Sequence, residues 1–334
     1  MAGDNCEPRF LESNPLTPNR TASDRAGQKT VLLTGANGFI GRSLLKNLSQ
    51  TPGLQVIATV RSATGLAHPA GVRELVIADP LNYPDWNEEL REVDSIVHVA
   101  GIISPPPEIE SEDQGNTAMM RVNRDLTKVL AENAVLANVN QFIYLSSMSL
   151  YGASSKNTLI TTETPVSIDG IYPESKYAGE LAIEDAFAGT PVGWIHVRPP
   201  MVVGEGTQGT FYSMANLCIR AGVSPFGAIR SPYPIVHLTT LCDFVVAAIK
   251  SGPIENGVYL VGEEVEHTLP GIIDEIASLS GQKVRHLPIP FSFVRALMTL
   301  AGKRSAFDHV TGNLTLETSK AHAVLRAFRE KKST

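Results

Sequence analysis

Two side chains that could exchange a proton lie four residues apart in Tyr172-Pro-Glu-Ser-Lys176. Pro173 fits a helix in its first turn, so the spacing predicts a helix from Tyr172 onward with Tyr172 and Lys176 on one face. A phenol with a pKa of about 10 is a poor acid or base at neutral pH. A nearby ammonium and a cationic nicotinamide would both favour the phenolate. This pair is therefore a candidate for acid–base catalysis.

A hydroxyl-rich turn, Ser146 to Ser149, follows the apolar run Gln141–Leu145. The run is typical of a buried parallel strand, and ligands of open parallel sheets bind beyond the carboxyl ends of such strands. Ser147 is therefore a candidate for catalysis and for substrate contact, and Ser149 for substrate contact. The alternative is a simple turn rich in hydroxyl groups.

A glycine-rich turn joins the apolar run Thr30–Leu33 to an amphipathic stretch that predicts a helix. Gly35 permits a tight turn, Gly38 lets a pyrophosphate approach the backbone, and Gly41 lets the helix pack closely on the strand. Three glycines also occur in ordinary turns, but the strand–turn–helix context favours a dinucleotide site. Its expected cofactor contacts are Gly35, Asn37, Gly38, Phe39, Ile40 and Gly41.

Other strand ends extend this predicted site. Asp79 would accept a hydrogen bond from an adenine amino group or cap the next turn, whereas His98, inside an apolar run, is expected to be a packed residue. Besides Tyr172 and Lys176, the further expected cofactor contacts are Asp79, Pro80, Val99, Ala100, Gly101 and Pro199.

The end of the second predicted strand, Gln55–Arg61, indicates which cofactor is bound. An acid at this place would bind a free ribose 2′-hydroxyl, whereas a basic residue accommodates the 2′-phosphate of NADP. The chain has Thr59-Val-Arg61-Ser62 here, with no acid. A solvated surface arginine is the alternative, but Arg61 can pair with phosphate. We therefore expect NADP(H), with NAD as the second possibility.

Composition excludes several classes of protein. The net charge of −6 and the pI near 5.8 do not favour nucleic acid or an anionic membrane as partner. Cys6, Cys218 and Cys242 lack disulfide or metal-ligand spacing, and no run approaches the length of a membrane span or a signal peptide. We expect a cytoplasmic protein without a bound metal.

The order of the predicted elements indicates an α/β fold, a Rossmann-type doubly wound parallel sheet with a smaller C-terminal lobe. Residues 1–29 are expected to be a disordered extension and residues 30–200 the dinucleotide-binding domain, with contributions from 235–262. Residues 201–330 would form mainly a substrate lobe. Further strands are expected at 74–77, 95–99, 194–198 and 258–261, helices at 117–137, 210–221, 241–249, 269–279, 291–300 and 320–332, and loops at 105–115 and 223–234.

The run Leu287 to Leu300 is apolar enough for a helix on a membrane surface. Its two prolines and its short length favour a helix of the lobe instead.

From Lys29 to Leu325, the chain resembles the extended short-chain dehydrogenases/reductases of the NAD-dependent epimerase/dehydratase type. The matching positions are Thr34-Gly-x-x-Gly-x-x-Gly41, Asp79, His98-Val-Ala-Gly101, Ser146-Ser147-x-x-x-Tyr151-Gly152, Tyr172-x-x-x-Lys176, Arg198-Pro199 and the segment 238–247. The segment from Gly204 to Arg230 looks most like nucleotide-sugar epimerases and 4-ketoreductases.

The resemblance implies roles for the candidate residues. Tyr172 would be the catalytic acid/base, Lys176 would hold the nicotinamide ribose and lower the pKa of Tyr172, and Ser147 would bind the reacting oxygen. Asn123 matches an active-site asparagine of the family. The resemblance also implies a homodimer, formed by the helices at 117–137 and 172–187.

The chain departs from its relatives at three places. Ser231-Pro-Tyr-Pro234 stands where many of them bind the substrate diphosphate with an arginine, so Arg230 is assigned that contact. Met148 and Ser149 replace the Asp-Glu pair of the dehydratases, so 4,6-dehydration is not expected. The end of the second strand, at Arg61, looks more like NADPH-using reductases than epimerases.

Three functions compete. The first is an NADP(H)-dependent oxidoreductase acting on a small-molecule ketone or secondary alcohol. The second is a UDP-hexose 4-epimerase with tightly bound NAD. The third is a redox-sensing regulator without catalysis, which the intact set of Ser147, Tyr172 and Lys176 disfavours.

Overall fold

The computed structural model describes residues 27–333 except 66–67, 106–108, 110, 153–157, 208, 301, 303–306, 308–310 and 312. Most of the expected extension, Met1–Ala26, and Cys6 therefore lie outside the described residues. So do parts of the loops around 105–115 and 153–170.

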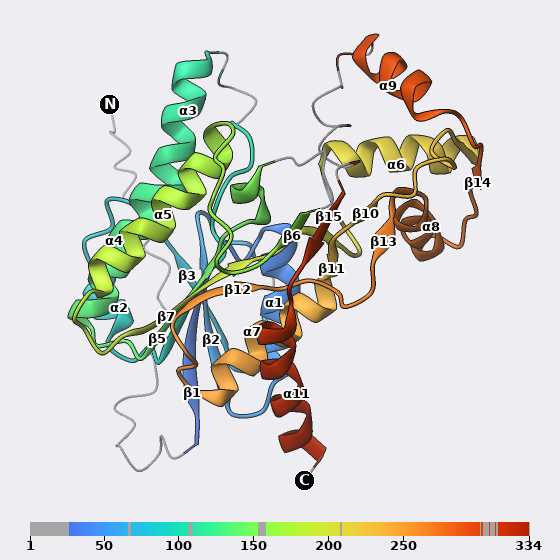
Figure 1. The fold of residues 1–334 in the computed structure, drawn as a ribbon. Helices are drawn as coiled ribbons and strands as arrows, with labels where there is room; N and C mark the ends of the chain where they lie inside the picture. The colour runs from blue at the N-terminus through green and yellow to red at the C-terminus, as the bar shows by residue number, and fades with distance from the viewer. Residues whose placement is uncertain are drawn as a thin grey trace, which may run out of the picture.

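A seven-stranded sheet in the order β12-β7-β5-β4-β1-β2-β3 forms the centre of the fold (Figure 1). Every neighbouring pair is parallel, and Leu32 of β1 is in register with Ile57 on one side and Ile96 on the other. The strands are β1 Lys29–Thr34, β2 Leu54–Val60, β3 Val72–Val76, β4 Ser95–His98, β5 Gln141–Leu145, β7 Gly193–Arg198 and β12 Gly257–Leu260. The predicted Rossmann-type sheet is thus confirmed.

Helices cover both faces of the sheet because successive strand residues point to opposite sides. Val31 and Leu33 join a core with α1, α7 and α11, whereas Leu32 joins the core with α2, α4 and α5. The first set is α1 Phe39–Ser49, α7 Leu238–Ser251 and α11 Ser319–Ser333; the second is α2 Trp86–Leu90, α4 Leu126–Leu136 and α5 Ile171–Phe187. Through Ala321 and Leu325, α11 packs into the first core, so the C-terminal helix belongs to the sheet and not to the lobe.

The lobe has a core of its own, which includes Ala215, Phe226, Ile272 and Val294. Its helices are α6 Thr210–Ala221, α8 Leu269–Leu279 and α9 Phe291–Leu300. Short strands pair as β8 Met201–Val203 with β11 Ile235–His237, β9 Val223–Ser224 with β14 Arg285–His286, and β10 Pro232–Tyr233 with β13 His267–Thr268. The prediction of a loop at 223–234 is therefore partly wrong. Residues near both of its ends form short strands, because each pairs with a strand that is distant in sequence.

The expected helix 117–137 is also wrong in its limits. Helix α3 spans Glu112–Met120, a π-helical turn η1 spans Arg121–Asp125, and α4 follows. Ser111 caps α3 by accepting a hydrogen bond from Gln114 N, and two acidic residues follow it. This pattern is a signal for the start of a helix, but Gly115 directly after it is unfavourable in a helix. That glycine is required by packing, since a Cβ at Gly115 would lie 2.6 Å from Pro105 Cγ.

Two further elements lie near the carboxyl ends of the strands. The 3₁₀ turn η2 spans Met148–Tyr151, and β6 Thr158–Ile160 pairs with β15 Leu314–Leu316.

Candidate active site

Ser147 and Tyr172 are brought together from different parts of the chain. Ser147 follows β5 by two residues and caps η2, where its Oγ accepts a hydrogen bond from Ser149 N at 3.1 Å. Tyr172 lies in the first turn of α5, after Gly170, whose φ of +96° favours glycine. Burial raises the pKa of the Tyr172 hydroxyl, and its hydrogen bond with Ser147 opposes that rise. The lowering of this pKa by Lys176 that the family resemblance implies is not among the causes that act on Tyr172 in this structure.

Lys176 is buried one helical turn after Tyr172. Its Nζ lies 4.3 Å from the centre of the Tyr144 ring, a cation–π contact. Burial lowers the pKa of Lys176 to about 7, against the opposing charge of Glu180. A Cβ at Gly101 would lie 3.5 Å from this Nζ and 3.0 Å from Asn123 Oδ1. Only a glycine leaves this space beside the lysine open.

Asn123 connects the end of β4 to the first turn of α5. It lies in η1, where Oδ1 accepts from Ile102 N and Nδ2 donates to Ile102 O and Ser175 Oγ, each at 2.9 Å. Ser175 Oγ donates in turn to Tyr172 O. Both amide protons of Asn123 are used by the protein, so this geometry makes it a positioning residue for the Tyr172 turn. A π-helical turn at such a place is a common feature of functional sites.

A buried ion pair, missed by the sequence analysis, holds α5 against the sheet. Arg198, at the end of β7, donates from Nε and Nη2 to the two carboxylate oxygens of Glu180 and from Nη1 to Tyr151 Oη at 2.7 Å. Burial alone would lower the pKa of Arg198, but Glu180 raises it. The available signal was the spacing of Tyr172, Lys176 and Glu180, which places all three on one face of a helix.

His98 is a packed residue, as predicted. Nδ1 accepts from Thr34 Oγ1 at 2.7 Å, and Nε2 donates to Thr127 Oγ1 at 2.9 Å; this tautomer follows because Thr127 Oγ1 donates to Asn123 O. Burial lowers the pKa of His98 to about 3. Thr34 Oγ1 also accepts from the N–H groups of Val99 and Ala100. The ring therefore joins the end of β1, the end of β4 and the start of α4, and this packing leaves it no role as an acid or base.

The glycine turn has the shape that a dinucleotide requires. Gly35 has φ +70°, and a Cβ there would lie 2.7 Å from Ala100 N; at Gly41 a Cβ would lie 2.0 Å from Gly35 O. Gly38 is the N-cap of α1, makes no side-chain cap hydrogen bond, and is followed by no acidic residue in the first turn. The first N–H groups of α1 are therefore available to an anion, which fits a pyrophosphate.

The other predicted contacts are placed around this turn. Arg61 is exposed directly after β2. Asp79 accepts from Leu81 N and Asn82 Nδ2 and lies 3.5 Å from Arg121, so it caps a turn as one of its two predicted roles requires. Pro199 is buried, and its carbonyl accepts from Met148 N, which links the end of β7 to η2.

The two predicted substrate contacts differ in burial and in their place in the fold. Ser149 Oγ is buried and has no hydrogen-bond partner among the described residues, so it is available to a ligand. Arg230 is exposed in the lobe, two residues before β10. Within the described part of the chain, no contact joins Arg230 to Ser147 or Tyr172.

A family model, the NAD dependent epimerase/dehydratase family, matches residues 31–262. This range runs from β1 to just beyond β12 and includes Ser147, Tyr172 and Lys176. The chain belongs to this family. It is therefore an enzyme of the nicotinamide-dependent oxidoreductase or epimerase type.

Two curated relatives show the range of proteins that this chain resembles. UDP-glucose 4-epimerase of Vibrio cholerae is 27% identical over 311 residues, which cover 90% of this chain and 91% of that protein. Dihydroflavonol 4-reductase of Callistephus chinensis is 24% identical over 282 residues, covering 79% and 75%. Among solved structures, UDP-glucuronic acid 4-epimerase of Bacillus cereus in complex with NAD has a TM-score of 0.67 at 19% identity, covering 89% of this chain and 90% of that one. The last comparison supports the fold.

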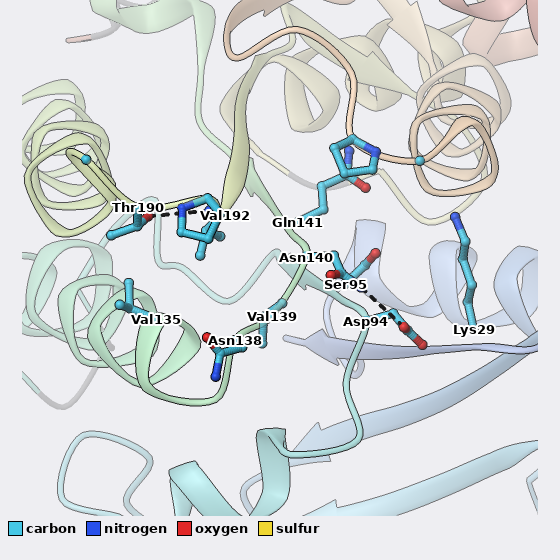
Figure 2. A pocket seen from close by; sticks show the side chains of 14 residues that line it. Lys29, Asp94, Ser95, Val135, Asn138, Val139, Asn140, Gln141, Thr190 and Val192 are labelled. Carbon is cyan, nitrogen blue, oxygen red and sulfur yellow. Dashed lines mark hydrogen bonds between the residues drawn. The ribbon is translucent and has the colours of Figure 1, made fainter. Parts of the chain in front are cut away.

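A separate pocket of about 650 Å³ lies at the amino ends of the central strands, on the side of the sheet away from Ser147 and Tyr172 (Figure 2). Lys29, Ser95 and Gln141, the first residues of β1, β4 and β5, line it. It opens at the amino ends of the strands, whereas ligands of this family of folds bind at the carboxyl ends. The pocket is therefore not part of the candidate active site.

Two features are absent from the described residues. None of their helices combines the length and apolar character that crossing a bilayer requires. Nor do three or more His, Cys, Asp or Glu side chains of that part gather as metal ligands.

The lowered pKa of Lys176 predicts a pH dependence of stability in this epimerase-family enzyme. Between pH 7 and 10 the unfolded lysine stays protonated while the folded one loses its proton, so the free energy of unfolding should rise with pH, by at most about 1.4 kcal/mol per unit. Urea unfolding at pH 7, 8 and 9 would measure this slope. Lys176→Met should flatten it, and the exposed control Lys128→Met should not. Equal slopes in all three proteins would contradict the assignment.

Proposed function

We propose that this enzyme is an NADP(H)-dependent oxidoreductase that interconverts a ketone and a secondary alcohol. The observation that carries the proposal is Arg61, exposed at the end of β2 where the residues 59–62 include no acid. A guanidinium can hold a 2′-phosphate with two hydrogen bonds, whereas a carboxylate would repel it. The dihydroflavonol 4-reductase similarity supports a net redox reaction.

The side chains divide the chemistry among them. A bound nicotinamide supplies or accepts the hydride. In reduction, the Tyr172 hydroxyl donates its proton to the substrate oxygen, while Ser147 Oγ, within reach of the same hydroxyl, donates a hydrogen bond to that oxygen. Lys176, one helical turn after Tyr172, carries positive charge only in its protonated form, which its pKa of about 7 limits to neutral pH and below. Asn123 hydrogen-bonds Ser175, which in turn bonds the tyrosine carbonyl, and so fixes the turn that carries the tyrosine. Ser149 Oγ and Arg230 are the proposed substrate contacts.

Arg61→Ala should weaken NADPH binding about 10- to 100-fold and leave NADH binding nearly unchanged, because charge-assisted hydrogen bonds to one phosphate are lost. Fluorescence titration of nucleotide-free protein with each cofactor measures this. Arg91→Ala, a change to an exposed arginine paired with Glu88, is the matched control. Equal affinity of the Arg61→Ala and unmodified proteins for NADPH would remove the basis of the proposal.

A second candidate is a UDP-hexose 4-epimerase, favoured by the similarity to UDP-glucose 4-epimerase over nine-tenths of the chain. It predicts tightly retained NAD and interconversion of UDP-glucose and UDP-galactose without added cofactor. Identifying the nucleotide released on denaturation, then assaying UDP-glucose, separates the two candidates.

A further inference from the structure

Helix α9 presents an apolar face that the lobe does not cover. Phe293 is 65% exposed and Leu300 is 87% exposed, and their spacing of seven residues places them on one side of the helix. Ala296, between them on the same side, is exposed as well. Figure 1 shows α9 at the outer end of the lobe, away from the sheet. A cluster of this kind is typical of an interaction surface.

The opposite side of α9 packs into the core of the lobe. Val294 is buried there, and Phe291 stacks on Phe307 with 5.6 Å between ring centres. The same core includes Phe226 and, at its border, Met298. The helix is therefore anchored by one side, and its exposed phenylalanine and leucine serve no packing in the described part of the chain.

The charge around α9 differs in sign from that of the whole chain. Formal net charge is −6, yet residues 276–307 contain no Asp or Glu and five basic residues, Lys283, Arg285, Arg295, Lys303 and Arg304. Lys283 and Arg285 are exposed in the segment that leads to α9. Acids adjoin this segment at its ends: Asp274 Oδ1 lies 2.9 Å from His286 Nε2, and Asp308 follows Phe307 in the sequence. Within residues 276–307 the chain next to α9 carries only positive charge, which complements a surface that is negatively charged and has an apolar layer beneath.

We infer that α9 and its flanking basic segment dock on an anionic lipid bilayer, with Phe293 and Leu300 inserted at the headgroup level. Ring and aliphatic side chains enter that layer, and Lys and Arg near it bind anionic lipid headgroups. Ten residues are too few to span a bilayer, so the helix lies on its surface. The net negative charge of the whole chain does not favour a membrane partner. The positive charge near α9 is a local exception, and this helix lies at the outer end of the lobe (Figure 1).

Vesicle co-sedimentation of the full-length protein tests the inference. Vesicles of phosphatidylcholine and phosphatidylglycerol in equal parts should bind about tenfold more protein than pure phosphatidylcholine, and high salt should abolish the difference. The double variant Phe293→Ser/Leu300→Ser should lose about tenfold in binding, and Lys283→Glu/Arg285→Glu should lose the preference for phosphatidylglycerol. Thermal unfolding should be unchanged in both variants because the altered side chains are exposed.

Val265→Ser is the matched control. Val265 is 71% exposed but lies between Glu264 and Glu266, so its loss should not affect vesicle binding. Absence of binding by the unmodified protein, equal binding to both vesicle types, or unaltered binding by Phe293→Ser/Leu300→Ser would overturn the inference. So would sedimentation showing that these two residues mediate self-association in place of vesicle binding.

Discussion

Tyr172→Phe should lower the rate of ketone reduction by about 10²- to 10⁴-fold, which is the usual contribution of a general acid. The change removes one hydroxyl, and with it the proton that the substrate oxygen would receive. The lost hydroxyl is buried and hydrogen-bonded to Ser147, whose Oγ keeps its second contact with Ser149 N. Because Tyr172 is also an expected cofactor contact but its ring is kept, cofactor affinity should fall far less than the rate.

Steady-state kinetics with NADPH and a ketone substrate, together with cofactor titration, check this prediction. Tyr177→Phe, five residues along α5, is the matched control and should keep the unmodified rate, because Tyr177 is outside the Ser147–Tyr172 contact. A Tyr172→Phe enzyme with full activity would show that another group supplies the proton. That outcome would leave the cofactor assignment at Arg61 intact, so the two proposals can fail separately.

Glu180→Gln should lower the free energy of unfolding by about 3–5 kcal/mol, because it leaves the Arg198 guanidinium buried without a counter-charge. Both side chains are almost wholly buried, so solvent does not screen the pair. Urea unfolding followed by circular dichroism measures the loss. The control Glu184→Gln, one turn further along α5, should cost about 1 kcal/mol or less, because Glu184 is half exposed beside His196.

A double variant distinguishes charge from geometry. Glu180→Leu/Arg198→Met removes both charges and should recover most of the stability that Glu180→Gln loses. If the single variant is as stable as the unmodified protein, the pair does not hold α5. The double variant should still have lower activity, since the pair fixes the helix that carries Tyr172 and Lys176.

Much of the site could be predicted because its signals are local in sequence. Gly35, Gly38 and Gly41 lie in seven residues, and the structure places them where a Cβ would collide with neighbouring backbone or come within 3.2 Å of it. Tyr172 and Lys176 lie on one helical turn, and helical periodicity alone puts them on one face. Ser147 was proposed from the rule for strand ends, which depends only on recognising Gln141–Leu145 as a parallel strand.

The predictions of secondary structure were wrong where an element depends on a contact with residues that are distant in sequence. Val223–Ser224 and Pro232–Tyr233 form strands because β14 and β13 pair with them, and no periodicity of two residues can be read in either. The π-helical turn at Asn123 depends on Ile102 and Ser175, each more than twenty residues away. Helix α11 belongs to the core of the sheet through Ala321 and Leu325, and it packs on α7 and β12, which lie more than fifty residues upstream.

By itself, the sequence determined the parallel α/β fold, and it predicted the dinucleotide turn and the proposed set of Ser147, Tyr172 and Lys176. Spacing and backbone conformation are sufficient for these features. Only the tertiary structure decided the surroundings of the side chains: that burial brings the pKa of Lys176 to about 7, that Arg198 pairs with Glu180, and that Asn123 hydrogen-bonds Ser175. Desolvation and long-range hydrogen bonds depend on which surfaces meet, and residue spacing does not specify that.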